Sequence, residues 1–237
     1  QSPVGVAVVD SQGEMVECNS ALAEIIGYSP EGVLAMNFED FSYPDDLEKE
    51  WPLINDLWAG KRDKYKMVKR YYHKAGHIVW VEVSASLVRD QEGTPKLGFA
   101  FVEDITKRVQ AEEELRESEN KMQSIYNVAP TGIGQVKDRT ILEVNPRICE
   151  MTGYSKEELI GKDARFLYPT QADYDYVGRE KYAQIAEHGI GKVETRWKKK
   201  DGEILNIILA STTINHTNPS KGMIFTALDI SERVKAE

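Results

Sequence analysis

The chain carries an internal repeat, and a repeat limits the folds that a chain can adopt. Residues 19–33, NSALAEIIGYSPEGV, are echoed by residues 145–159, NPRICEMTGYSKEEL. Residues 73–86, HKAGHIVWVEVSAS, return at the same offset as residues 199–212, KKDGEILNIILAST, and EDITKRV then returns as LDISERV. Matched blocks in one order predict two copies of one domain rather than a single large domain.

The duplication divides the chain into four parts. We expect a first domain over residues 1–106, a helical linker over 107–127, a second domain over 128–231 and the start of a further linker helix over 232–237. With 237 residues, of which 41% are apolar, each copy is long enough for a core of its own. Because the chain begins with Gln and ends inside a helical pattern, we expect it to be part of a longer polypeptide.

Each copy has the same order of predicted elements. In the first copy, two strands flank the turn SQG, and a helix then begins at Asn19, a typical capping residue, and ends near Gly27. A second short helix begins at Ser29, and less regular helical turns follow it. Three strands complete the copy, with Gly76 in the tight turn between two of them. This order predicts an α+β fold, a five-stranded antiparallel sheet with helices on one face, with space for a pocket between the two layers.

Charge and composition exclude several classes of protein. The formal net charge is −9, and Lys and Arg alternate with Asp and Glu, so we expect no nucleic-acid partner. No apolar run approaches the roughly 20 residues of a membrane-spanning helix, so we expect no membrane segment and a cytoplasmic location. Cys18 and Cys149 are expected to be small buried thiols in a reducing compartment.

The chain lacks recognisable catalytic motifs. It contains no nucleophile elbow, no dinucleotide-binding loop and no Walker lysine after a glycine loop. Asp45, Asp46, Asp173 and Asp175 fall in helical turns, where acidic residues are usually solvated or lie at helix N-termini. We therefore expect this chain to be non-catalytic.

The order of motifs resembles that of the PAS family of sensory domains. The resemblance rests on an Asn before GYS, a hairpin glycine and a terminal D-I-[TS], each present twice, and it covers nearly the whole chain. The first copy lacks the helix that precedes the first strand in this family, whereas the second copy has it in ENKMQSIYNV. The resemblance implies two tandem PAS domains that act as the sensory input of an output domain in the same polypeptide, most often a histidine kinase and otherwise a diguanylate cyclase.

PAS domains bind different cofactors, so each cofactor has to be judged from the residues. The segment GKDARFLYP is similar to the part of light-sensing LOV domains that carries the photoreactive cysteine, but Ala164 stands at the cysteine position and Asp163 replaces an Asn. The strand positions that would bond a flavin ring fall on Trp197, Ile207 and Ala227, which would leave its polar edge unpaired. We therefore expect no LOV-type flavin, while a flavin bound in another manner stays open.

The histidines do not indicate haem or a metal ion. The resemblance places the axial haem ligand near Tyr176, and His188 lies further along the chain at an expected solvated helix end. His73 and His77 straddle the hairpin turn, where we expect them to be exposed rather than bound to a metal. The expected cofactor is therefore none, or an unknown small molecule.

The inward-facing strand positions and the aromatic residues of the helical part define the candidate pockets. Tyr71 and Trp197 are equivalent, and each has apolar neighbours on the adjacent strands. The candidate pocket residues are Trp51, Trp58, Tyr71, Val81, Val83, Val102, Tyr168, Tyr176, Trp197, Ile207, Leu209 and Ala227. The aromatic rings either fill the cavities themselves, because interiors tolerate few voids, or they face a small apolar or aromatic ligand. Side chains alternate between the two faces of a strand, and Trp80 and Phe99 occupy positions that alternate with the inward-facing ones. We therefore expect them on the outward face, available for a partner.

The repeated junction between the last strand and the following helix is the candidate signal joint. The joint residues are Asp104 and Thr106 in the first copy and Asp229 and Ser231 in the second. An Asp carboxylate at this position can accept the first free N–H groups of the helix and so fix the angle between strand and helix.

The linker carries a heptad-like pattern. Apolar and small residues alternate gaps of three and four at Ala111, Leu115, Ser118, Met122, Ile125 and Ala129. This pattern favours a parallel homodimer through the linker helices, and a solvated single helix is the alternative. We expect a sensory input and dimerisation module that binds a small molecule in at least one pocket; the alternative is a ligand-free structural relay.

Overall fold

The structure, a computed structural model, describes residues 3–215 and 221–236. The chain forms two compact units, Gln1–Arg116 and Glu117–Glu237, which we call the N-terminal and the C-terminal unit. The division falls inside helix α4 (Thr106–Val128). The predicted linker lies within this helix, and the predicted domain boundaries stay predictions.

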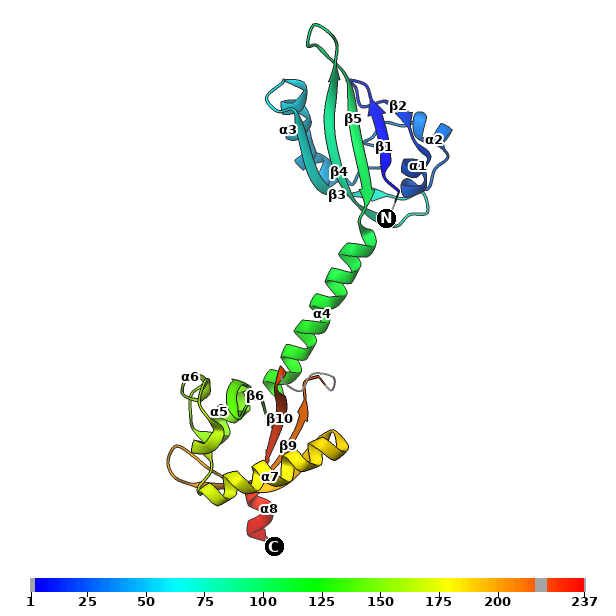
Figure 1. Ribbon diagram of the computed structural model, residues 1–237. Coiled ribbons are helices and arrows are strands. Elements are labelled where there is room, and N and C mark those ends of the chain that lie inside the picture. The colour runs from blue at the N-terminus through cyan, green and yellow to red at the C-terminus, as the bar shows by residue number, and fades with distance from the viewer. Residues whose placement is uncertain (1–2, 216–220, 237) are drawn as a thin grey trace. The chain divides into compact units, whose positions relative to one another are not determined.

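The N-terminal unit is built on a five-stranded antiparallel sheet with the strand order β2-β1-β5-β4-β3. Its elements are β1 (Gly5–Val9), β2 (Met15–Cys18), α1 (Ser20–Ile26), α2 (Pro30–Leu34), α3 (Pro44–Trp58), β3 (Lys64–Tyr72), β4 (Ile78–Arg89) and β5 (Pro95–Asp104). The core lies between the sheet and the helices, where Leu22 and Ile26 of α1 and Val33 of α2 pack with Val81 and Val83 of β4. Helix α3 contacts β3 and β4 at the other end of the same sheet (Figure 1).

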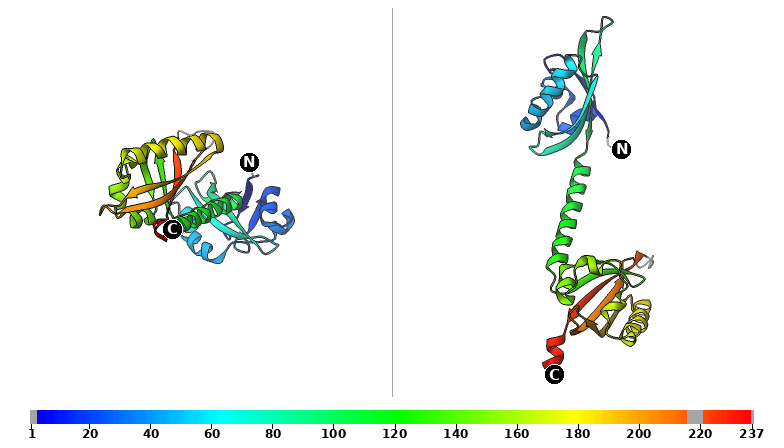
Figure 2. Two further views of the ribbon diagram at one scale, coloured as in Figure 1. Left: turned by 90° about the horizontal axis from the view of Figure 1, so that it is seen from below. Right: turned by 90° about the vertical axis from the view of Figure 1, so that its left-hand side faces the viewer.

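The C-terminal unit repeats this arrangement with the strand order β7-β6-β10-β9-β8. Its elements are β6 (Gly132–Lys137), β7 (Thr140–Val144), α5 (Pro146–Thr152), α6 (Lys156–Leu159), the 3-10 helix η1 (Ala164–Leu167), α7 (Gln171–His188), β8 (Ile190–Lys198), β9 (Ile204–Thr213), β10 (Met223–Asp229) and α8 (Ser231–Ala236). Leu159, Leu167 and Val177 pack against Ile207 and Leu209 of the sheet, and α7 lies along its own sheet (Figure 2). The predicted α+β architecture is thereby confirmed for both copies.

The repeated Asn before GYS ties the first helix of each copy to the first strand. Asn19 Oδ1 accepts the backbone N–H groups of Leu22 and Val6, at 3.0 and 2.9 Å. Asn145 Oδ1 accepts those of Ile148 and Ile133, at 3.2 and 2.9 Å. One side chain therefore caps a helix and anchors a strand, which explains why the sequence places Asn at this point in both copies.

Cys18 and Cys149 differ from the sequence-based expectation, and Asp46 agrees with one of its two alternatives. Cys18 and Cys149 are partly exposed rather than buried, because Cys18 ends the edge strand β2 and Cys149 lies on the short helix α5, so each packs against the core on one side only. Asp46 was expected to be solvated or to lie at a helix N-terminus. It does lie in the first turn of α3, but it is buried, because its carboxylate accepts two hydrogen bonds from the Arg70 guanidinium, at 2.8 and 2.9 Å.

Candidate functional site

The N-terminal unit contains a cavity of about 360 Å³ between its sheet and helix α3. This volume lies at the lower end of the range for pockets that hold small molecules, roughly 300 to 1,000 Å³. Its lining is rich in aromatic side chains: Phe38, Phe41, Trp51, Trp58, Tyr65 and Tyr71. The cavity therefore offers mostly apolar, aromatic surface to whatever enters it.

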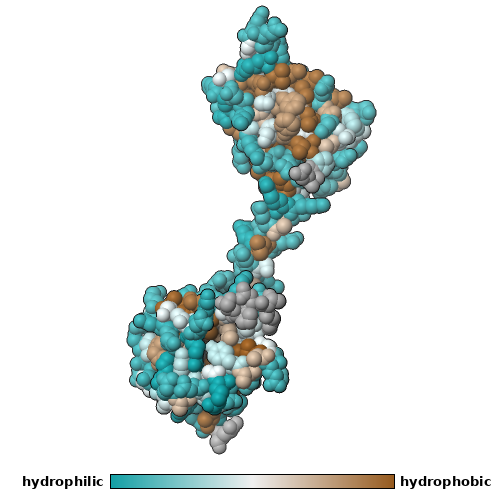
Figure 3. All heavy atoms as spheres, in the orientation of Figure 1, coloured by the Kyte–Doolittle hydropathy of each residue, from teal (hydrophilic) through white to brown (hydrophobic). Residues whose placement is uncertain are grey.

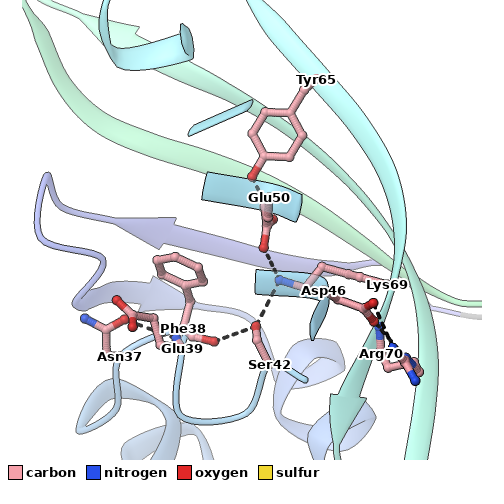
Figure 4. A network of polar contacts seen from close by, with 9 residues as sticks. All are labelled: Asn37, Phe38, Glu39, Ser42, Asp46, Glu50, Tyr65, Lys69 and Arg70. Carbon is pink, nitrogen blue, oxygen red and sulfur yellow. Dashed lines mark hydrogen bonds and ion pairs between the residues drawn. The ribbon is translucent and has the colours of Figure 1, made fainter. Parts of the chain in front are cut away.

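One wall of the cavity carries a buried ion pair between Lys69 of β3 and Glu50 of α3 (Figure 4). The Lys69 and Glu50 residues are 1% and 2% exposed. Lys69 Nζ donates to Glu50 Oε2 and, at 2.9 Å, to Ser42 Oγ. Tyr65 Oη donates to Glu50 Oε1 at 2.8 Å. The carboxylate and the ammonium thus compensate each other in a place that water does not reach freely.

The electrostatics of this wall follow from its burial. Burial lowers the pKa of Lys69, and the adjacent Glu50 opposes that shift. Burial together with Glu50 raises the pKa of Tyr65 and of Tyr71 far above the usual range, so both phenols stay protonated. The Lys69 ammonium also lies 4.9 Å from the centre of the Tyr71 ring and 5.6 Å from that of Phe38, which adds a cation–π contribution.

Sequence reasoning missed Lys69 and Glu50. The signal for Lys69 was present, because side chains alternate along a strand and Tyr71 was already assigned to the inward face. Two residues before Tyr71, Lys69 must then point inward as well. Glu50 had no comparable signal, since the turns of α3 were predicted only loosely and its partner was not identified.

Four of the six pocket residues predicted for the first copy line the cavity. They are Trp51, Trp58, Tyr71 and Val83. Val81 and Val102 do not reach it and are instead packed in the core, at 0% and 1% exposure.

The equivalent cavity of the C-terminal unit is much smaller, about 30 Å³. Tyr168, Trp197 and Leu209 are among the residues that line it. Ile207 and Ala227 are fully buried in the core and do not reach it. Tyr176 lies elsewhere, 41% exposed in a surface groove beside Asp173 and Arg196. The structure thus keeps one aromatic-lined pocket open and nearly fills the other.

One pair of facing strand residues differs in size between the two cavities. Phe225 of β10 lies in the C-terminal cavity wall and packs edge-to-face on Trp197, with the ring centres 6.2 Å apart. Its strand partner is Gly134, where an added Cβ would come within 2.5 Å of the Phe225 ring. The equivalent strand pair in the N-terminal unit is Ala100 with Ala7, two small residues that leave the space empty.

The two candidate joints share one geometry. In the first, the Thr106 N–H donates to Asp104 Oδ1 at 2.8 Å, and Thr106 Oγ1 accepts the Trp80 N–H of β4 at 3.0 Å. In the second, the Ser231 N–H donates to Asp229 Oδ1 at 2.8 Å, and Ser231 Oγ accepts the N–H of residue 206 in β9 at 2.9 Å. Each joint therefore bonds the start of the outgoing helix to the beginning of a neighbouring strand, β4 or β9, of its own sheet.

Comparisons with known proteins agree with this architecture. A family model described as PAS fold matches residues 15–100, and a model described as PAS domain matches residues 130–232. The chain consists of two PAS domains in tandem.

Two relatives of this PAS pair carry the names of signalling proteins. The probable diguanylate cyclase DgcE of Escherichia coli is 36% identical over 112 residues, 47% of this chain and 10% of that protein. The sensor protein TdiS of Thauera aromatica is 32% identical over 114 residues, 48% of this chain and 21% of that protein. The chain thus spans only a small part of these relatives.

Solved PAS structures also match. The ethanol-bound PAS domain of a LuxR-family transcriptional regulator from Burkholderia thailandensis is 22% identical, with a TM-score of 0.43, over 46% of this chain and 96% of that one.

None of the helices in residues 3–215 and 221–236 combines the length and apolar character needed to cross a bilayer.

Helix α4 follows the first PAS domain and exposes its heptad positions. Leu115, Met122 and Ile125 are 61%, 68% and 54% exposed. The pattern was expected to continue to Ala129, but the helix ends at Val128, because the residue before a proline is disfavoured in helical conformation. These apolar heptad positions of α4, which we call its apolar seam, are therefore not covered by any other part of the described chain.

The outer face of the first PAS domain also carries apolar side chains. Figure 3 shows them gathered where β1, β4 and β5 face the viewer in Figure 1. Phe99 packs edge-to-face on Phe101 at 5.0 Å between ring centres, and Phe101 is 50% exposed. Trp80 is half-buried, with the Arg70 guanidinium 5.6 Å from its ring.

The histidines form no metal cluster in the part of the chain that the structure describes. The His73 and His77 rings stack with their centres 4.2 Å apart, and His73 Nδ1 accepts the Ala75 N–H at 3.1 Å. His77 is exposed, as expected, whereas His73 is half-buried against Gly27, where it covers the end of α1.

Proposed function

We propose that this chain is the sensory input module of a larger signal-transduction protein, and that its first PAS domain binds the small molecule that is sensed. The observation that carries the proposal is the difference between the two cavities, about 360 Å³ in the first domain and about 30 Å³ in the second. Of these two cavities, only the first can enclose a whole ligand of several heavy atoms without rearrangement.

The lining of the first cavity supports a particular class of ligand. Aromatic rings form most of the wall, and the polar part is concentrated around Glu50, Lys69 and Tyr65. Each Glu50 oxygen accepts one hydrogen bond from the protein, and a carboxylate oxygen has capacity for a second. We therefore favour a small apolar or aromatic molecule with one hydroxyl or N–H group that donates to Glu50.

Strand β4 supplies a short route from the cavity to the outgoing helix. Val83 and Ala85 of β4 line the cavity, and Trp80 of the same strand donates its N–H to Thr106 at the start of α4. A ligand that shifts β4 would therefore act directly on the joint, and the fixed geometry at Asp104 would pass the shift to the helix axis.

The second PAS domain fits the role of a relay. Its cavity is nearly filled by its own side chains, but its Asp229–Ser231 joint has the same geometry as the first. In this proposal, α4 pairs in a parallel homodimer through its exposed apolar seam, and the relay leads to an output domain outside this chain. A histidine kinase or a diguanylate cyclase in the cytoplasm is the output we favour.

The test uses the purified chain. Native mass spectrometry should show a retained or added small molecule, and a panel of small aromatic alcohols, phenols and amines should contain members that raise Tm. An absorption spectrum distinguishes a flavin or haem from a colourless ligand, and sedimentation equilibrium reports the dimer. A colourless chain that retains no mass and shows no shift across the panel would contradict the sensing role and leave the ligand-free relay.

A further inference from the structure

The second PAS domain buries a lysine that has no acidic partner. Lys181 of α7 is 5% exposed, and its ammonium forms no ion pair or hydrogen bond with a residue that the structure describes. Its Nζ lies 5.5 Å from the centre of the Tyr182 ring. The buried lysine of the first domain differs, since Lys69 is matched by Glu50. A lysine side chain with so little exposed surface usually lies close to a counter-charge.

A second cation lies in the same place. Arg139 and Lys181 line one cavity of about 30 Å³, together with Tyr168, Tyr182 and Trp197. Arg139 sits in the turn between β6 and β7 with a φ of 64°, in the left-handed region that side chains other than glycine rarely adopt. The turn therefore holds an unusual backbone conformation at the residue that supplies the guanidinium.

Within residues 3–215 and 221–236, the Arg139 guanidinium forms no ion pair with an acidic side chain. Its Nη2 donates to the backbone oxygen of Tyr174 at 2.7 Å, and its centre lies 3.2 Å from the centre of the Tyr174 ring. Gly178 of α7 makes room for it, because a Cβ there would come within 2.9 Å of Nη1. These contacts fix the position of the cation, and none of them is to an acidic group.

Most neighbouring polar groups of the cavity wall are donors, and Asp138 and Asp163 are not part of the cavity lining. Trp197 Nε1 is buried near the Tyr168 hydroxyl but makes no hydrogen bond of ordinary geometry within the described chain. Asp163 accepts from the Tyr174 hydroxyl, and the exposed Asp138 forms no ion pair with a described residue. Burial, together with Arg139, lowers the pKa of Lys181 to about 8. The cavity wall is thus rich in donors and positive charge and poor in acceptors.

We propose that Arg139 and Lys181 form an anion site in the second PAS domain that binds the carboxylate group of a small molecule. A cavity of 30 Å³ has room for about two water-sized groups, which matches the two oxygens of a carboxylate. An adjacent surface groove shares Val136, Arg139 and Tyr182 with the cavity, and it can hold the remainder of the molecule. The site is independent of the ligand proposed for the first domain.

The test is calorimetric titration of the full chain with acetate and with benzoate at constant ionic strength, beside chloride and phosphate. The expected result is binding of at least one carboxylate that weakens at least tenfold in Lys181→Met and in Arg139→Met. Lys198→Met, an exposed lysine on β8 of the same domain, is the control and should bind as wild type. Circular dichroism confirms that each variant is folded.

Three results would overturn the proposal. The first is the absence of carboxylate binding to the wild-type chain. The second is carboxylate binding of equal strength in wild type and in a folded Lys181→Met variant, which would place the anion elsewhere. The third is tighter binding of chloride or phosphate than of either carboxylate, which would make the pair an inorganic-anion site.

Discussion

The buried ion pair of the first PAS domain gives the sharpest stability prediction. Glu50→Gln keeps the shape of the side chain and an acceptor for Tyr65, but it removes the charge that compensates Lys69. Removing one partner of a buried pair typically costs about 3 to 5 kcal/mol. The loss of unfolding free energy has an upper limit, because Lys69 can release its proton and become neutral rather than stay buried as an unpaired cation.

This upper limit on the loss of unfolding free energy follows from the ordinary lysine pKa of 10.5. Deprotonating such a group at pH 7 costs about 5 kcal/mol, at about 1.4 kcal/mol per pH unit, and at pH 9 it costs about 2 kcal/mol. Because Glu50 no longer opposes the effect of burial, the pKa of Lys69 in the folded variant lies below its value in folded wild type, so the folded variant binds fewer protons than folded wild type in this range. Stability relative to wild type therefore rises as the pH rises.

The assay is urea unfolding followed by tryptophan fluorescence at pH 7 and pH 9. Three of the four tryptophans, Trp51, Trp58 and Trp80, lie in the first domain, so the signal reports mainly its unfolding. We expect Glu50→Gln to lose about 3 to 5 kcal/mol at pH 7 and about 2 kcal/mol at pH 9. Glu48→Gln, an exposed change on the same helix, should stay within about 0.5 kcal/mol of wild type. Equal stability of Glu50→Gln and wild type at both pH values would refute the reasoning.

Three further predictions concern the second domain and the joint. Phe225→Ala should enlarge the small cavity and cost about 3 to 5 kcal/mol of unfolding free energy of the second domain, measured by calorimetry; a loss below about 1 kcal/mol would mean that the ring does not fill it. Thr106→Val should cost about 1 to 2 kcal/mol, because the Trp80 N–H loses its acceptor. Hydrogen exchange of that amide should accelerate, and unchanged exchange would contradict the bond. Lys181→Met, in buffer free of small carboxylates, should stabilise the second domain by up to about 3 kcal/mol at pH 7, since the pKa of Lys181 falls from 10.5 to about 8 on folding. The wild-type stability should then rise between pH 8 and pH 10.5, and a variant with the same pH profile would contradict this.

The fold could be predicted from the sequence because its signals are local. Asn19 and Gly27 delimit α1, and the D-I-[TS] segment places an Asp where its carboxylate meets the first N–H groups of the next helix. Such features depend on residues close together in the chain, and their repetition in the second copy confirms each assignment independently.

The site was predicted less completely because it depends on pairings across the sheet. Alternation from Tyr71 would have placed Lys69 inward, but nothing local connects it to Glu50 on α3. Likewise, the open and filled cavities differ through Ala100 and Phe225, whose effect depends on the strand residue that each one faces. Long-range register of this kind is not contained in any one segment.

The most direct test of the account introduces into the first cavity the side-chain pair that fills the second cavity. The double variant Ala7→Gly/Ala100→Phe reproduces in the first domain the Gly134–Phe225 pair that fills the second. Ligand binding to wild type and to this variant is measured by calorimetry, with the panel compound that gives the largest rise in Tm. The account predicts that the variant folds and loses binding at least tenfold, while Phe225→Ala retains it. Undiminished binding in the folded double variant would contradict the claim that the first PAS cavity is the sensor.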